Sequence, residues 1–356
     1  MKDNRTARRD RTDRRDRTDR FEPLPGLKSG HVQTLINSSK IRRPLIRHRS
    51  RGMLAAAVPH ILDCGGGVRL MGYYSGRPQS APPDLCILIH GWEGDADSSY
   101  LVSAAGHLWN RGYSIFRLNL RDHGPSHHLN SGLFHACRID ETIGAVRAIQ
   151  ETFPFRRLLL AGFSLGGNFA LRIGADAHTA GLDLERVAAV CPVLEPGHTI
   201  DALEPGSDKD PRLCLYHWYF LRKWRRSLTI KSRLFPGLID PDAVRQHPSI
   251  RSLTEYFVPR YTAFACADDY LSGYAVTGSR LAGLRIPATI IASADDPVIP
   301  AKDLRQVARP SCLCLEKQTY GGHCGFIPDF RMESWINKRL EALFQTREKS
   351  QGGPDE

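Results

Sequence analysis

Short apolar runs alternate with helical patterns along most of this chain of 356 residues. The apolar runs are residues 85–90, 113–119, 157–163, 187–193, 288–292 and 312–317. Helical spacing of apolar residues is found at residues 99–110, 138–153 and 166–176, and again from Met332 to Phe344. Continuous apolar strands alternating with helices are typical of a mostly parallel sheet covered on both faces. The sequence therefore predicts an α/β fold, in which ligands bind beyond the carboxyl ends of the strands.

The alternation is interrupted once, between about residues 197 and 283, where no strand pattern is found. We expect this segment to be a helical cap inserted before the strand at residues 288–292. With 41% apolar residues the chain can bury one large core, which we place at residues 21–346. Residues 1–20 and 347–356 are expected to be disordered tails.

The net charge of +11 is concentrated in three segments: the first 20 residues, residues 42–51 and residues 212–233. The first segment repeats RRDRTD in tandem and has almost nothing apolar to offset the entropy cost of ordering. Its five aspartates argue against a mitochondrial presequence. This tail is either a solvated arm or a binding segment for an anionic partner. Because the charge is local, we expect no nucleic-acid partner.

The chain contains no apolar stretch near the roughly 18 residues of a spanning helix, and no apolar segment near its first residue. We therefore expect a cytoplasmic protein. Its nine cysteines form no C-x-x-C pair, a pattern that favours reduced thiols over a disulfide or zinc framework. Most are expected to be small core residues, and Cys324 stands out because it follows the candidate catalytic histidine described below.

The stretch LLLAGFSLGGN contains a G-x-S-x-G motif centred on Ser164, between an apolar run and a helical pattern. A serine at the tip of such a turn takes strained backbone angles. A Cβ two residues before or after it would collide with neighbouring backbone, and glycine removes that collision at Gly162 and Gly166. The helix that follows offers free N–H groups to a developing oxyanion. This context predicts an exposed serine nucleophile.

A serine nucleophile needs a base that takes its proton and an acid that orients the base. Asp295 and Asp296 follow the apolar run at residues 288–292, and His323 follows the run at residues 312–317 after two glycines. Ser164, one of the two aspartates and His323 therefore form a candidate triad, in that chain order.

A second donor for the oxyanion is expected in the loop LIHGWEGDADSSY, where an apolar run ends. The backbone N–H of Trp92 is the candidate, paired with that of Leu165. The indole of Trp92 would either form a wall of an acyl pocket or pack in the loop.

These motifs belong to a longer set, which consists of GHVQTL, HGWEGDADSSY, RLNLRDHGPSHHLNSGLFH, GFSLGGN, ADDPVIP and GGHCGF. With this set the chain, from Gly26 to about Phe344, resembles the YheT-type branch of the α/β-hydrolase fold serine esterases. That group includes yeast medium-chain fatty acid ethyl ester enzymes and mammalian ABHD-type phospholipases. The spacing of Asp296 to Pro300 matches the D-x-V-x-P form usual in such hydrolases, so Asp296 is the expected acid.

The resemblance implies an α/β-hydrolase fold and a serine hydrolase of short- to medium-chain carboxylic esters, with small-molecule substrates. It implies no cofactor and no metal, the histidine-rich stretch being a family signature. Alternatives are acyl transfer to an alcohol, a lipid or phospholipid esterase and, from another class, a non-catalytic binding protein. The acyl length, the alcohol and the oligomeric state stay open. The cap departs from the family at Glu255-Tyr256, where a Phe-Asp pair is usual, and at Tyr270-Leu271, where a Tyr-Tyr pair is usual.

One segment of the cap has apolar residues at helical spacing and basic residues on its remaining surface. The apolar positions, which we expect over the serine, are Cys214, Trp218, Leu221, Trp224 and Leu228. The basic positions, which we expect outside, are Arg222, Lys223, Arg225 and Arg226. The basic surface is either the solvated side of a lid or a weak contact with anionic membrane surfaces.

Overall fold

A computed structural model of the chain describes residues 20–77, 81–204, 206, 210 and 212–346. The two expected tails, at 1–20 and 347–356, lie outside the described residues except for Arg20.

Eight strands form one sheet in the order β1-β2-β4-β3-β5-β6-β7-β8. They are β1 (Ala57–Asp63), β2 (Arg69–Ser75), β3 (Leu85–Ile89), β4 (Ser114–Asn119), β5 (Leu158–Phe163), β6 (Leu184–Val190), β7 (Ala288–Ser293) and β8 (Leu313–Gln318). β2 pairs antiparallel with both β1 and β4, and all other neighbours are parallel. The predicted α/β-hydrolase fold with its mostly parallel sheet is confirmed.

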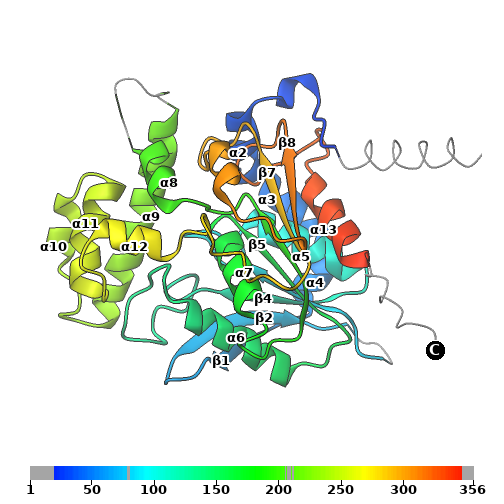
Figure 1. Cartoon of the computed structure of the whole chain (residues 1–356), viewed down its shortest axis with the longest axis horizontal. Coiled ribbons are helices and arrows are strands. Elements are labelled where there is room, and N and C mark those ends of the chain that lie inside the picture. Colours follow the sequence, from blue (N-terminus) through cyan, green and yellow to red (C-terminus); the bar gives the residue numbers. More distant parts are fainter. Residues whose placement is uncertain (1–19, 78–80, 205, 207–209, 211, 347–356) are drawn as a thin grey trace, which may run out of the picture.

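Helices cover both faces of the sheet (Figure 1). Alternate side chains of β3 show the two layers: Ile87 and Ile89 pack in one core with α6 (Ile139–Thr152) and α7 (Leu165–Asp176). Leu88 packs in the other core, with the helices α3 (Arg42–Arg49), α4 (Arg51–Ala55), α5 (Ser99–Asn110) and α13 (Trp335–Gln345). Because β3 is buried on both faces, its sequence is apolar throughout.

The chain before β3 was not predicted. It contains η1 (Pro25–Leu27), α2 (Gly30–Asn37), α3 and α4, followed by the antiparallel strands β1 and β2. β1 lies at the edge of the sheet, where Val58 and Ile61 are exposed, so its sequence lacks the continuous apolar run of a buried strand.

In its described residues, the segment between β6 and β7 folds as five helices. They are gathered on one side of the sheet in Figure 1. They are α8 (Pro196–Leu203), α9 (Leu213–Leu234), α10 (Pro241–Gln246), α11 (Ile250–Tyr261) and α12 (Ala267–Gly273). We call this segment the cap. A short 3-10 helix, η2 (Ala301–Gln306), follows β7. In the part of the chain that the structure describes, no helix combines the length and the hydropathy needed to cross a membrane.

Candidate active site

Ser164 lies at the turn that joins β5 to α7, with φ 54° and ψ −120°. A positive φ is strained for a residue with a Cβ, and the glycines on either side are required by close approach. A Cβ on Gly162 would lie 2.0 Å from the carbonyl oxygen of Gly166, and a Cβ on Gly166 would lie 2.3 Å from that of Ile89. The turn is fixed by the Ser164 N–H, which donates to the carbonyl of Val190 at 2.9 Å. The strained turn therefore presents the hydroxyl beyond the end of β5.

His323 is paired with Asp296, which follows β7. Its Nδ1 lies 2.9 Å from Oδ2 of Asp296. The other oxygen, Oδ1, accepts hydrogen bonds from the N–H groups of Val298 and Ile299 at 2.8 and 3.0 Å. Because both oxygens of the carboxylate are engaged, Asp296 holds the imidazole in one orientation.

Asp295 has a different contact. Its Oδ1 accepts the N–H of Gly322 at 2.9 Å, so this carboxylate holds the backbone of the histidine loop. Of the two aspartates, Asp296 is the one that the structure brings to the imidazole of His323.

The pKa of His323 reflects two opposing effects. Burial is the largest single effect and disfavours the imidazolium, but the carboxylate of Asp296 and the neighbouring Cys324 together outweigh it and raise the pKa to about 9. The site therefore stabilises a protonated His323, which is the state that forms when the imidazole takes a proton from a hydroxyl.

The N-terminal helix α2 holds the loop that carries His323. Thr34 Oγ1 accepts the N–H of His323 at 2.9 Å and donates to the carbonyl of Gly30 at 2.7 Å. The fully buried Gln33 accepts the N–H of Ile327 at 2.7 Å and donates to the carbonyl of Ile327 at 2.9 Å. These bonds explain the GHVQTL motif, to which sequence reasoning assigned no role.

The loop after β3, which carries Trp92, is held from two sides. The Gly91 N–H donates to the hydroxyl of Tyr100 at 2.9 Å, and the Glu93 N–H donates to Nε2 of His123 at 3.1 Å. Burial pushes the pKa of His123 well below its usual range, which keeps Nε2 unprotonated and able to accept. The backbone of Trp92 is thus fixed between two anchored residues.

The N–H of Leu165 is the first of α7, and the first N–H groups of a helix have no partner within it. It follows Ser164 directly, so it is available to a developing negative charge at the serine.

A cavity of about 270 Å³ lies over the turn. Ser164, His323 and Trp92 line it, together with Thr34 of α2 and Phe220 of α9. Asp296 lies outside its wall, bonded to the imidazole. We call this space the catalytic cavity.

A second cavity, of about 90 Å³, has an apolar wall formed by the cap and by the core. Leu165 and Trp224 line it, and Trp92 lines both cavities. The Trp92 indole stacks on Phe220, with ring centroids 5.4 Å apart, and meets Trp224 edge-on at 5.5 Å. We call this space the cap cavity.

The face of α9 that covers the site differs from the expected one. Leu221 and Leu228 are buried and Trp224 lines the cap cavity, but Trp218 is 55% exposed, so its predicted place over the serine is wrong. The reason is that α9 contacts two regions, the core through Leu221 and Leu228 and the loop of Glu93 through Lys223. Its Lys223 Nζ donates to the carbonyl of Glu93 at 2.6 Å, so this predicted outer residue faces the core, and Trp218 is rotated out to solvent.

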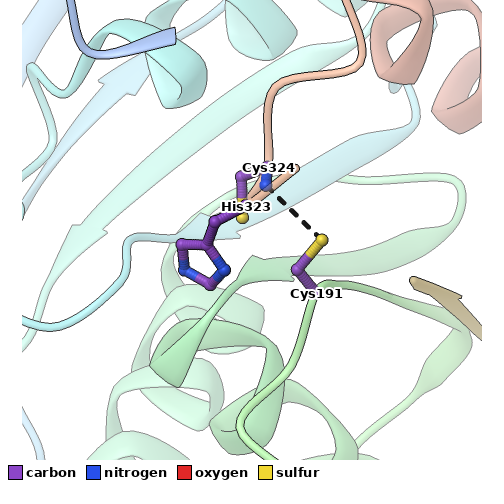
Figure 2. Close-up of side chains that lie close together, drawn as sticks. All are labelled: Cys191, His323 and Cys324. Carbon is purple, nitrogen blue, oxygen red and sulfur yellow. Dashed lines mark hydrogen bonds between the residues drawn. The ribbon is translucent and has the colours of Figure 1, made fainter. Parts of the chain in front are cut away.

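Among the described residues, one group of three side chains of the metal-binding types His, Cys, Asp and Glu has ligand atoms close enough together to hold a metal ion. The three residues are Cys191, His323 and Cys324 (Figure 2). The histidines of RDHGPSHH belong to no such group within the described ranges. His123 of that stretch instead anchors the Trp92 loop.

Comparisons with known proteins agree with the fold. The family model described as alpha/beta hydrolase fold matches residues 85–329. A protein of Escherichia coli K12 named "Putative esterase YheT" is 24% identical over 72% of this chain and 77% of its own length. The Caenorhabditis elegans protein abhd-3.2 is 24% identical over 68% of this chain and 64% of its own length. The solved structure of the Pyrococcus furiosus esterase Pf2001 superposes with a TM-score of 0.52 at 14% identity, covering 81% of this chain and 91% of that one. The resemblance to the YheT type is thereby confirmed.

Proposed function

The chain belongs to the alpha/beta hydrolase fold family, and we propose that it is a serine hydrolase that cleaves carboxylic esters through an acyl-enzyme on Ser164. The observation that carries the proposal is the pairing of His323 with Asp296 at the wall of a cavity that Ser164 also lines. The esterase names of the bacterial and archaeal proteins above support the same reaction class.

In the first half of the reaction, Ser164 Oγ attacks the ester carbonyl while Nε2 of His323 takes the hydroxyl proton. Nε2 is the nitrogen left for this step, because Nδ1 is bonded to Asp296. The N–H groups of Trp92 and Leu165 would stabilise the negative charge that develops on the carbonyl oxygen. Collapse of the intermediate breaks the bond to the alcohol, which leaves with the proton from His323.

In the second half, water attacks the acyl carbon and His323 again takes the proton. The bond to Ser164 then breaks while His323 returns this proton to Oγ, and the acid and the free enzyme are released. A carboxylate or an N–H group of this chain would stabilise each charge that develops, so the proposed mechanism requires no cofactor.

The two cavities support an apolar acyl group of short to medium length. The carbonyl would lie in the catalytic cavity beside Ser164, and the chain would extend past Trp92 toward the cap cavity. Burial of each methylene contributes about 0.8 kcal/mol, so an apolar wall favours a chain over acetate.

A lipid ester is a second candidate substrate, favoured by the mouth of the catalytic cavity. Leu215 and Tyr219 line this cavity and are nevertheless 59% and 47% exposed. Arg222 and Arg226, farther along α9, are also exposed. Apolar and cationic side chains side by side suit the surface of an anionic membrane.

A cytoplasmic location stays a prediction from the sequence.

The test is labelling with a fluorophosphonate probe, which bonds covalently to an activated serine. We expect labelling of the wild-type protein and none of Ser164→Ala. A series of p-nitrophenyl esters from acetate to palmitate then measures the acyl preference, and product analysis with an added alcohol separates hydrolysis from acyl transfer. A wild-type protein that takes no label and cleaves no ester would be a non-catalytic binding protein.

A further inference from the structure

Two cysteines lie against the catalytic histidine (Figure 2). Cys191 directly follows β6, and Cys324 directly follows His323. Their two sulfurs and one ring nitrogen of His323 all lie within 4.8 Å of one another. Parallel strands end at the same edge of a sheet, which is why residues 133 positions apart in the chain meet here.

The two sulfurs are held in place by the backbone. Cys191 Sγ accepts the N–H of Cys324 at 3.4 Å, and the Cys191 N–H donates to the carbonyl of Ile291 at 2.7 Å. Cys324 Sγ lies 3.7 Å from the carbonyl of Val190. Both residues are buried and have positive φ, 44° for Cys191 and 60° for Cys324. The backbone therefore holds both sulfurs beside the imidazole before any ion binds.

The donor types match a borderline-soft cation. Two thiolates and one imidazole form a known zinc set that leaves a fourth position open. The donors around a tetrahedral zinc ion lie about 3.5–3.8 Å apart, so the group would contract by the order of 1 Å. Coordination through Nε2 would keep the bond from Nδ1 to Asp296, the usual arrangement in which a zinc-bound histidine donates its other ring N–H to a carboxylate.

The site is reachable from solvent through the catalytic cavity, because Cys324 lines that cavity beside Ser164 and His323. An ion held there occupies one ring nitrogen of His323 and leaves the proton of the neutral imidazole on the other. The imidazole then cannot accept the proton of the Ser164 hydroxyl, and acylation stops.

We propose that Cys191, Cys324 and His323 form an inhibitory zinc site inside the catalytic cavity. On binding, each thiol and the protonated imidazole release a proton to water and a ring nitrogen of the neutral imidazole coordinates, so the ion leaves again when a chelator competes for it. The inhibition rests on the proposed hydrolase function, whereas the binding of the ion does not.

The first measurement is the inhibition of p-nitrophenyl butyrate hydrolysis by graded Zn²⁺, on protein freed of metal by a chelator. We expect inhibition of the wild type that EDTA reverses. Second-shell changes weaken metal sites by about 10–100-fold, so loss of a ligand in Cys191→Ser should raise the inhibitory Zn²⁺ concentration at least about tenfold. Cys191→Ala, whose side chain cannot coordinate, should also raise the inhibitory Zn²⁺ concentration at least about tenfold. Each variant is compared with its own rate without zinc.

The matched control is Cys266→Ser, because Cys266 is exposed and lies outside the group. This variant should be inhibited like the wild type. Equal inhibition of wild type, Cys191→Ser and Cys191→Ala would overturn the proposal.

The second measurement does not depend on activity. Cadmium, a softer analogue of zinc, gives a thiolate-to-metal absorption in the ultraviolet. We expect this absorption at one ion per chain in the wild type and its loss in Cys191→Ala. If the absorption is present but no ester is cleaved, the metal site stands and the proposed function fails. If the absorption is absent from the wild type, the site does not exist.

Discussion

The histidine loop and the cap helix α9 both line the catalytic cavity but differ in how they are held. Around the loop, backbone groups are bonded to particular side chains: His323 to Thr34, Gly322 to Asp295, and Ile327 to Gln33. The part of α9 that faces the cap cavity is held by apolar packing, with Leu221 and Leu228 in the core and Trp224 at the cavity, whereas Lys223 and Lys231 of the same helix donate to Glu93 and Asp122. Directional bonds fix one geometry, whereas packing tolerates alternatives. We therefore expect changes near the loop to affect the rate and changes in the cap to affect the choice of substrate.

The largest expected effect is that of Ser164→Ala. Removal of the nucleophile should lower kcat by the order of a millionfold, as in other serine hydrolases. Stability should be unchanged or slightly higher, because the φ of 54° remains and only one oxygen is lost. Ester hydrolysis and thermal unfolding of both proteins measure this. Wild-type activity in pure Ser164→Ala would refute the assignment of the nucleophile.

Next is the difference between the two adjacent aspartates. Asp296→Asn should lower kcat by the order of a thousandfold or more, because the amide cannot orient and stabilise the imidazolium as the carboxylate does. Asp295→Asn is the matched control. It keeps an oxygen for the N–H of Gly322, and it should lose far less activity. The reverse ranking would assign the acid to Asp295.

A smaller effect concerns pH. The pKa of His323 is raised to about 9, and below it the imidazole is protonated and cannot take the proton of the Ser164 hydroxyl. The kcat/KM of a non-ionising ester should therefore fall about tenfold per pH unit as the pH drops below about 9. In Asp296→Asn the half-maximal pH should move down, because the charge that raises the pKa is gone. A half-maximal pH at or below that of free histidine in the wild type would contradict the strong Asp296 effect.

The smallest effect separates two tryptophans of α9. Trp224→Ala enlarges the cap cavity and removes its aromatic wall, so the ratio of octanoate to acetate hydrolysis should fall by about tenfold. Trp218→Ala, on the exposed side of the same helix, should leave the ratio unchanged. The ratio is independent of the amount of active protein. Equal ratios in both variants would show that the cap cavity does not hold the acyl chain.

The buried strands from β3 to β7 and the turn at Ser164 could be predicted because their causes are local. A strand buried on both faces must be apolar, and a strained turn requires glycines at fixed spacing. The exposed edge strand β1 has no such signature. The outward rotation of Trp218 depends on where α9 meets the Glu93 loop, and that contact is not encoded in helical spacing.

Within the site, too, features with a local cause could be predicted and features that depend on distant contacts could not. Ser164, Asp296 and His323 each follow a recognisable strand, so their residue types and order could be found from the sequence. The roles of Thr34, Gln33 and Cys191 depend on contacts across the sheet edge, between residues far apart in the chain. A single sequence does not report such distances.

The hydrogen bonds from α2 to the histidine loop determine how much of the chain the active site needs. The matched family region, residues 85–329, contains every member of the candidate triad. It omits Gln33 and Thr34, which fasten the loop of His323, and also both antiparallel strands. A chain shortened to residues 85–329 would keep Ser164, Asp296 and His323. It would lose the hydrogen bonds from α2 that hold the loop of His323. The smallest working unit therefore begins upstream of α2, and the segment before β3, which contains no candidate catalytic residue, supports the loop of His323, the last residue of the candidate triad.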